Sequence, residues 1–548
     1  MGPFALPIAL VVISGAALIL SYALIKPALF IVILSSMGLS IFFRCLKPAY
    51  ARHVGGEPVL LAFGLPIAAW VTPNAWLLYG VILAAMLFIA RKPGRAAPTY
   101  LFALLLLPGL DQSMSIGSLK LFEFGVHDAL AVGAAVRVAM QPGGSAARKS
   151  LDLPFIGVLL LLVTATARDT SITNFVRVLV NTGLDCALPY YIVSRGVRTM
   201  DDLRLCMVYV AGASAVLSII LMYEAHASWP LYNVLYDRYG IYIQMMLKSR
   251  GGVLRAGGPF IESTSMAMVL VFCFFATWLS RPTFRSSLYY YAMLVLLLGG
   301  MTAPQSRGAW IGLLIGMTAA DIYRRRIGSA VTRGGMIVGA LLLLVALAPM
   351  SPYLSETMGL SGGSTDTAQY RQRLFDRGME EFAKSPIVGY SSPEILIHLA
   401  DLRQGEGIVD FVNTYIFVAL VSGLIGLTIF IGSFLIYLGQ LWGCRGRLRA
   451  DNPDIDCAAF IFAGLITPME MLIFTSFGGR PELFVFVFFA LATAAVGIIA
   501  RTRSRRPAPP SPTATQPTPS PAVARDDAGQ HQRDPEVSAD TCVVAVPN

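Results

Sequence analysis

The stretch Met207–Tyr223 (MVYVAGASAVLSIILMY) contains no charged residue and is long enough to cross a bilayer as a helix. Similar apolar runs recur along most of the chain: Ala5–Ile25, Ala28–Phe43, Phe155–Ala167, Ser265–Leu279, Tyr290–Met301, Ile311–Ala320, Gly335–Ala348, Phe411–Leu438 and Leu483–Ala500. The 548 residues are 55% hydrophobic and 14% charged, with a mean hydropathy of +0.65. These features predict an all-α polytopic membrane protein.

Short basic segments separate the apolar runs in pairs. They contain Arg44, Lys47 and Arg52; Arg91, Lys92 and Arg95; Arg148 and Lys149; Arg195, Arg198 and Arg204; Arg281 and Arg285; Arg324, Arg325, Arg326 and Arg333; Arg445, Arg447 and Arg449; and Arg501, Arg503, Arg505 and Arg506. Because loops rich in Lys and Arg stay in the cytoplasm, we expect these segments and both termini there. Spans of about 20 residues then give about 14 transmembrane helices, within a range of about 12 to 16. The net charge of +10 reflects this anchoring and does not indicate a nucleic acid partner.

The same pattern predicts the organisation of the chain. It comprises an N-terminal transmembrane bundle (1–223), a long outer loop (224–258), transmembrane helices (259–350), a large outer loop (351–410) with an amphipathic helix at 367–384, C-terminal transmembrane helices (411–500) and a disordered, Pro-rich cytoplasmic tail (501–548). The composition of the tail cannot bury a core. The seven cysteines are scattered and none lies in either outer loop, so no disulfide framework is predicted.

One arginine in the second outer loop has an unusual position. At 100° per residue, Tyr370–Lys384 places Leu374, Phe375, Gly378, Met379 and Phe382 on one apolar face, with Arg371 in the middle of that face. A guanidinium aimed at a packed surface suggests a buried anionic partner. Two plainer interpretations stay open: an ion pair with an acidic residue elsewhere, and a side chain that reaches out to water.

Two further polar stripes have both functional and structural interpretations. Arg177, Asn181 and Asp185 recur every four residues along Asn174–Val193, so they share one side of a helix that is otherwise apolar. This stripe is consistent with a binding site for an anionic head group. It is equally consistent with an internal Arg–Asp ion pair that holds helices together. The second stripe consists of Lys120, Glu123, His127 and Arg137 on a helix expected at Lys120–Met140, and a helix lying in the membrane interface explains it equally well.

The first outer loop begins with aromatic residues and ends with basic residues. Tyr232, Tyr236, Tyr239 and Tyr242 share a helical face, which fits either an interfacial aromatic belt or a platform for stacking sugars. The loop then continues through Lys248, Arg250 and Arg255 into Gly257-Gly258-Pro259. Glycines at this place permit a close approach of the backbone to a ligand.

Four motifs in order resemble those of the O-antigen ligase and polymerase superfamily. They are Arg250-Gly-Gly-Val-Leu-Arg255-Ala-Gly-Gly-Pro-Phe260; Ser306-Arg307-Gly308-Ala309; Arg371 with Phe375, followed by Ser385-Pro386-Ile387-Val388-Gly389; and Asn413-Thr414-Tyr415, followed by Ser422-Gly423-Leu424-Ile425-Gly426. The resemblance covers about Arg250–Tyr437, and the N-terminal half is similar only in general hydropathy.

This resemblance implies a GT-C-like glycosyltransferase of the bacterial inner membrane, with both long loops periplasmic. Such enzymes transfer a glycan from undecaprenyl pyrophosphate without a metal or nucleotide-sugar cofactor. The acceptor is a growing glycan in polymerases and the lipid A core in ligases; membrane lipids and other polysaccharide assembly proteins are further expected partners. Arg255 and Arg371 are expected to bind the pyrophosphate or the donor glycan, with Arg250, Arg307 and Arg177 as further substrate-binding candidates, although Arg307 also fits an interfacial anchor.

The chain departs from the family pattern at the expected base. Many relatives carry a histidine directly before the Asn-Thr-Tyr-like segment, and this chain has Val412 there. Asp410, Glu262 and His398 are the candidates to activate an acceptor hydroxyl. The missing histidine favours a polymerase of O-antigen or exopolysaccharide units over a ligase. A lipid-linked glycan flippase and a membrane scaffold are the alternatives from other classes. A transporter would be expected to show internal repeats, and the sequence shows none.

Overall fold

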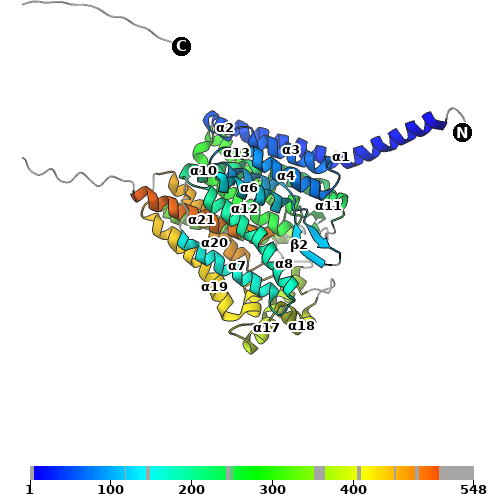
Figure 1. Cartoon of the computed structure of the whole chain (residues 1–548). Coiled ribbons are helices and arrows are strands. Elements are labelled where there is room, and N and C mark those ends of the chain that lie inside the picture. Colours follow the sequence, from blue (N-terminus) through cyan, green and yellow to red (C-terminus); the bar gives the residue numbers. More distant parts are fainter. Residues whose placement is uncertain are drawn as a thin grey trace, which may run out of the picture. The chain divides into compact units, whose positions relative to one another are not determined.

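The computed structural model describes residues 5–117, 119–142, 149–241, 249–250, 252–350, 364–403, 409–449, 452–475 and 480–504. The chain divides into the units Met1–Ser504 and Arg505–Asn548, and the second lies outside the described residues together with most of the predicted tail. The first unit is a bundle of helices (Figure 1).

The elements of the first half of the chain are α1 (Ala5–Cys45), α2 (Pro48–Val54), α3 (Glu57–Val71), α4 (Ala75–Ile89), α5 (Ala96–Leu106), β1 (Gln112–Ile116), β2 (Leu119–Phe124), α6 (Val126–Met140), α7 (Asp152–Ala167), α8 (Ile172–Thr182), α9 (Leu188–Gly196), α10 (Met200–Ala227), α11 (Asn233–Arg238), β3 (Ser249–Arg250) and β4 (Val253–Leu254). The second half contains α12 (Ser263–Leu279), α13 (Ser287–Thr302), α14 (Arg307–Tyr323), α15 (Ile327–Leu347), α17 (Ser364–Lys384), α18 (Ser392–His398), α19 (Thr414–Arg445), α20 (Asp454–Met471) and α21 (Arg480–Ser504).

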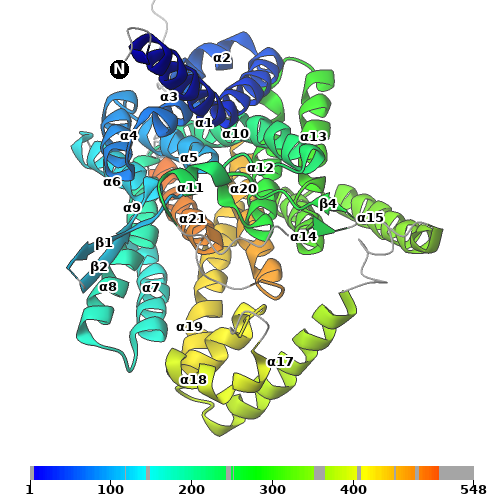
Figure 2. The ribbon, with the colours of Figure 1, turned by 90° about the vertical axis from the view of Figure 1, so that its right-hand side faces the viewer.

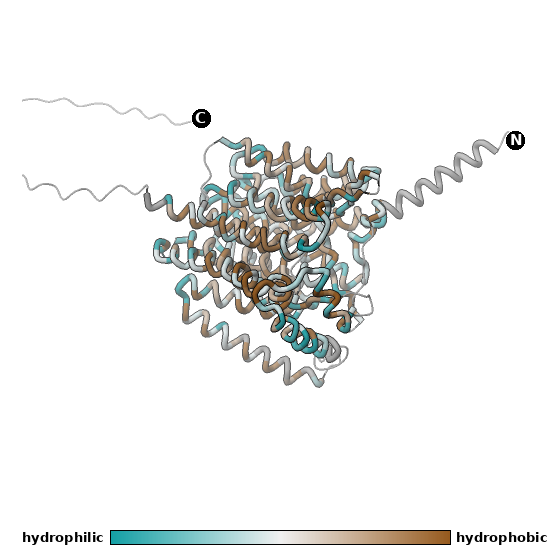
Figure 3. Tube along the Cα trace, turned by 60° about the horizontal axis from the view of Figure 1, so that its bottom comes forward, coloured by the Kyte–Doolittle hydropathy of each residue, from teal (hydrophilic) through white to brown (hydrophobic). Residues whose placement is uncertain are grey.

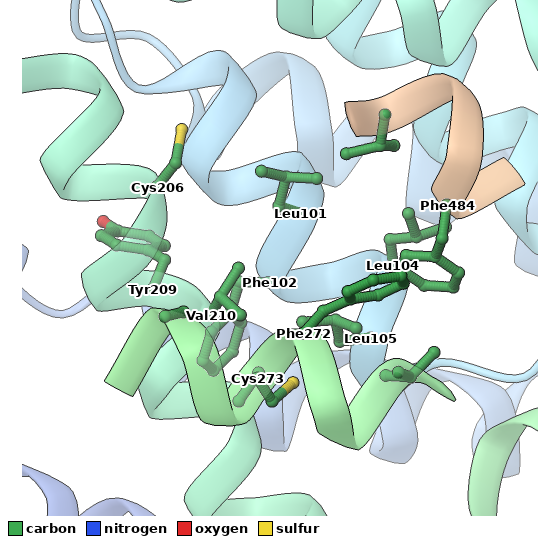
Figure 4. Packing of buried hydrophobic residues seen from close by; sticks show 14 of the residues in the cluster. Leu101, Phe102, Leu104, Leu105, Cys206, Tyr209, Val210, Phe272, Cys273 and Phe484 are labelled. Carbon is green, nitrogen blue, oxygen red and sulfur yellow. The ribbon is translucent and has the colours of Figure 1, made fainter. Parts of the chain in front are cut away.

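The apolar run Met207–Tyr223 forms the middle of α10, which is buried along most of its length. Thr199 caps the helix, since its side chain accepts a hydrogen bond from Asp202 N and the Asp202 carboxylate accepts one from Thr199 N. Around it lie α1, α5, α12 and α13, and side chains from α5, α10, α12 and α21 interdigitate in the core (Figure 4). Small residues permit this close packing: a Cβ at Gly300 would lie 2.7 Å from Ser218 Cα.

Among the described residues, four helices are long and apolar enough to span a membrane: Ile25–Cys45 within α1, α10, α19 and Glu482–Arg501 within α21. The pair α2 and α3, bent by 47°, adds a fifth if it counts as one broken span. Figure 3 shows hydrophobic residues along the packed helices. The other apolar helices are shorter: α7 and α13 have 16 residues each, or about 24 Å of helix against a hydrocarbon core of about 30 Å. The expected total of about 14 spans therefore stays a prediction.

Basic segments that the sequence places on one side of the membrane contact one another. Lys47 N donates a hydrogen bond to Thr283 O and Arg285 N donates one to Cys45 O, each over 2.9 Å. Further links are Arg204 Nη2 to Asp454 Oδ1 (3.0 Å), Arg324 Nε to Asp456 Oδ1 (2.6 Å) and Arg445 Nε to Tyr323 O (2.8 Å). These contacts gather the segments at one end of their helices; which end faces the cytoplasm stays a prediction.

The helices α17 and α18 form a module beside the first half of α19 (Figure 2). The module has an apolar core of its own, made of Ala165, Tyr370, Leu374, Ile395, Leu399, Leu402, Val409, Leu420 and Val421. The helix expected at 367–384 lies within α17, but the face that packs against the rest of the protein is narrower than the predicted apolar face. Phe375 and Met379 are 50% and 46% exposed, because α17 packs through a narrow stripe of residues four or three apart.

Candidate functional site

The first motif is a loop anchored on the connection between α13 and α14. Ala256 N donates to Ala303 O over 3.1 Å, and two arginine side chains bind the next carbonyls of the same connection. Arg255 Nε donates to Pro304 O (3.1 Å), and Arg250 Nη1 donates to Gln305 O (2.9 Å). Since α14 begins at Arg307, the first two motifs of the sequence are brought together at this connection.

The charges at this connection influence one another. Burial is the main cause that lowers the pKa of Arg255 to about 10, and the neighbouring cations Arg250 and Arg307 act in the same direction. Glu262 opposes them, and its carboxylate also accepts a hydrogen bond from the Ser265 hydroxyl. We call Arg250, Arg255 and Arg307 the arginine cluster. Three partly buried arginines, two of which act on the charge of the third, favour an anionic ligand, which would relieve their mutual repulsion.

A buried carboxylate holds the end of the first motif in place. Glu224, in the last turn of α10, is fully buried and accepts hydrogen bonds from Leu231 N (2.9 Å) and Gly258 N (3.0 Å). The second bond reaches a glycine with a φ of +53°, where the chain turns toward Phe260. Sequence reasoning missed this role because Glu224 directly follows the apolar run and was interpreted only as the start of a loop.

We expect Glu224→Gln to loosen the first motif. A glutamine keeps one acceptor oxygen, so one of the two buried N–H groups loses its partner, which costs about 1–3 kcal/mol. Thermal unfolding of the purified protein in detergent, together with limited proteolysis of the 224–262 region, measures the effect. The control is Glu123→Gln, because Glu123 lies at an exposed position and pairs with Lys120. An unchanged melting temperature and cleavage pattern for Glu224→Gln would contradict the assignment.

Arg371 lies at the edge of the α17 module, against the segment that follows α20. Its Nη2 donates to Phe474 O over 3.4 Å, and its guanidinium lies 5.7 Å from the centre of the Phe474 ring. Partial burial lowers the pKa of Arg371, and the negative charge of Asp410 opposes this shift. The Tyr370 hydroxyl fixes the backbone of Asp410, since it donates to Asp410 O and accepts from Asp410 N, each over 3.0 Å. Arg371 is nevertheless an exposed residue, so the prediction that its guanidinium points into a packed apolar face is wrong.

The segment after Arg371 docks into a kink of α19. Gly423 has a φ of +60° inside this helix, and the break leaves two N–H groups free for the Pro386–Gly389 loop. Leu424 N donates to Pro386 O (2.8 Å) and Ile425 N donates to Ile387 O (3.3 Å). The segments that contain Gly389 and Gly423, which are far apart in the sequence, thus form one joint. This joint fixes the α17 module, and with it Arg371, relative to α19.

The Asn-Thr-Tyr segment ties the start of α19 to the end of α20. Asn413 caps α19 by accepting from Tyr415 N (2.9 Å) and Ile416 N (3.2 Å). Thr414 N donates to Leu472 O (2.9 Å), its hydroxyl donates to Thr475 O (2.7 Å), and the Tyr415 hydroxyl donates to Met469 O (2.7 Å). Val412, at the position of the histidine of many relatives, packs against the module core. These residues therefore hold the segment 469–475 in place.

The candidate His398 is the last residue of α18 and contacts α17. His398 Nδ1 lies 3.1 Å from Glu381 Oε2, and the Lys384 ammonium binds Glu381 Oε1 at 2.6 Å. The His398 ring also packs against Tyr390, with ring centres 4.8 Å apart. This arrangement joins α17 to α18 about ten residues, or roughly 15 Å of helix, beyond Arg371. We interpret it as structural.

Arg177 belongs to a different part of the fold. It bonds Asn174 on the short helix α8, and Asn181 Oδ1 accepts from Glu123 N over 3.1 Å. The helix expected at Asn174–Val193 runs without a break from α8 through a π-helical turn at Gly183–Ala187 into α9, and this turn, which contains Asp185, interrupts the regular spacing of the predicted stripe. The structure shows no contact between Arg177 and the arginine cluster within the described residues.

Two other expectations about secondary structure and exposure are corrected. The helix expected at Lys120–Met140 begins only at Val126, and Lys120 and Glu123 lie on β2 of a hairpin with β1. The loop tyrosines form neither a sugar platform nor an interfacial belt, since Tyr232, Tyr236 and Tyr239 are buried around α11. Tyr242 lies outside the described residues.

The fold and the site define a helical membrane protein with arginine-bearing loops at one end of its bundle. Residues 292–431 match the family model described as O-Antigen ligase, a range that contains Arg307, Arg371, Asp410 and Gly423. This match supports the resemblance to the O-antigen ligase and polymerase superfamily that the motifs predicted. A search of curated proteins found no significant match.

Proposed function

We propose that this chain is an integral membrane glycosyltransferase that polymerises polysaccharide repeat units carried on undecaprenyl pyrophosphate at the periplasmic face. The arginine cluster is the observation that carries this proposal. In the transfer, an acceptor hydroxyl attacks the anomeric carbon of the donor sugar, and the bond from that carbon to the pyrophosphate oxygen breaks. The bonding electrons leave with the pyrophosphate, so negative charge grows where a cluster of guanidinium groups stabilises it.

Arg371 supplies a further cation from the α17 module, next to Asp410. We propose that Arg255 and Arg371 bind the pyrophosphate or the donor glycan, with Arg250 and Arg307 contributing positive charge. The acceptor hydroxyl also needs a proton acceptor, and Asp410 and Glu262 are the candidates that sequence reasoning named near these arginines. His398 takes no part in this proposal because Glu381 and Tyr390 engage its ring.

A ligase that transfers the finished glycan to the lipid A core is the second candidate, and the family description favours it. The observation that favours a polymerase is Val412: an apolar side chain packed on the module core replaces the histidine of many relatives. Both activities use the same lipid-linked donor and differ in the acceptor. A flippase for the lipid-linked glycan is the alternative outside the enzyme class.

A gel of surface and lipid-linked polysaccharide from a strain lacking the protein tests the proposal. We expect lost polymer, with single repeat units on lipid A or accumulating on the lipid carrier, and restoration of the polymer by the wild-type gene. Long chains stranded on the lipid carrier beside bare lipid A core would identify a ligase instead. An unchanged glycan profile would overturn the glycosyltransferase proposal.

A further inference from the structure

Glu470 is an acidic residue without a compensating charge in the last turn of α20. Both of its carboxylate oxygens are enclosed, and neither has a hydrogen-bond partner. Among the enclosed carboxylates of the described residues, Glu470 alone has both oxygens unpaired, and no described Lys or Arg forms an ion pair with it. An enclosed carboxylate without donors is costly for a fold, so such a residue is a candidate for chemistry.

The surroundings of Glu470 connect it to both arginine-bearing parts of the site. Its Oε2 lies 3.0 Å from the position that a Cβ on Gly312 would take, so this glycine of α14 makes room for the carboxylate. Gly312 follows Arg307 by five residues, or about 8 Å of helix. The helices α14 and α20 pack side by side in this region.

On its other side, Glu470 adjoins the segment that binds the remaining motifs. Met469 O accepts from the Tyr415 hydroxyl, and Phe474 O accepts from Arg371. Glu470 thus lies where α14, the start of α19 and the neighbour of Arg371 meet. The residue as a whole is partly exposed, although its two carboxylate oxygens are enclosed.

We propose that Glu470 is the proton acceptor of the transfer reaction, an inference that rests on the proposed function. As the acceptor oxygen bonds to the anomeric carbon and the pyrophosphate leaves, the hydroxyl proton passes to a Glu470 carboxylate oxygen. Asp410 and Glu262 each act electrostatically on an arginine of the site, Arg371 and Arg255 respectively. No described Lys or Arg forms an ion pair with Glu470. We assign to Glu470 the role of proton acceptor because Val412 stands in place of the histidine of many relatives.

The test compares two acceptors in proteoliposomes loaded with lipid-linked glycan: the natural hydroxyl acceptor and sodium azide. Azide is already an anion, so its attack on the anomeric carbon needs no proton acceptor. We expect Glu470→Ala and Glu470→Gln to lower transfer to the hydroxyl acceptor by at least about 100-fold. Formation of the glycosyl azide stays within about threefold of wild type, and Glu470→Asp keeps part of the hydroxyl transfer.

Glu262→Gln and Asp410→Asn serve as matched carboxylate variants in the same assay. The proposal is overturned if either of them, rather than Glu470→Gln, loses only the hydroxyl transfer. It is also overturned if Glu470→Gln transfers to the hydroxyl at the wild-type rate, or if it loses both products, since that pattern means a structural role. A wild-type protein that makes neither product would instead refute the proposed function.

Discussion

Arg371→Lys is expected to lower glycan transfer by about 10²–10³-fold, which is the usual effect of removing one donor that stabilises transition-state charge. A lysine keeps the positive charge but loses the planar fork that binds two phosphate oxygens at once. It also changes the cation–π contact that the guanidinium makes with the Phe474 ring. The measurement is the rate of polymer formation in membranes supplied with lipid-linked glycan, normalised to the amount of protein.

The control for this prediction is Arg373→Lys on the same helix. Arg373 is exposed two residues further along α17, so its replacement changes the same kind of side chain outside the site. We expect near wild-type transfer for this variant. Equal rates for Arg371→Lys and Arg373→Lys, at equal protein levels, would mean that Arg371 only pairs with Asp410 or reaches out to water.

Gly423→Ala is expected to release the Pro386–Gly389 loop from α19 and to destabilise the α17 module by about 3 kcal/mol. A Cβ at Gly423 would overlap the Ile387 carbonyl oxygen and lie 2.6 Å from Val388 N. The positive φ adds about 1–2 kcal/mol for any residue with a Cβ, and separation of the joint breaks hydrogen bonds that contribute about 1 kcal/mol each. Hydrogen exchange of the amides in α17 and α18 measures the loss.

Gly432→Ala is the matched control for this second prediction. Gly432 lies in the same helix, and an added Cβ there meets no atom within 4 Å. Alanine is the better helix former by about 1 kcal/mol, so this variant should be neutral or slightly more stable. Unchanged exchange in Gly423→Ala would show that the joint does not fix the module.

The sequence predicted the features that depend on local pattern. The run Met207–Tyr223 lies inside α10, and the helix expected at 367–384 lies inside α17. Motif order also predicted that the first two motifs belong to one site, although the hydrogen bonds of Arg255 and Arg250 to Pro304 O and Gln305 O depend on folding. The family match supports the resemblance on which those roles were based.

What the sequence did not reveal depends on tertiary contacts. The hairpin of β1 and β2 replaces the first turns of an expected helix, since Gly117 at a φ of +61° permits the tight turn and the strands then pair. Glu224 and Glu470 carried no pattern in one sequence, because their significance comes from partners present or missing in space. The burial of the loop tyrosines around α11 likewise requires neighbours that a helical wheel does not contain.

The separate apolar core beneath α17 has a consequence for how such proteins diversify. Because this module is held through its apolar core and through the glycine joint with α19, its outer surface can change without disturbing either contact. Selection for a different sugar would then leave its record in the module, and selection for the lipid carrier would leave its record in the bundle. Exchanging the segment 364–411 between relatives is therefore the natural way to transplant glycan preference.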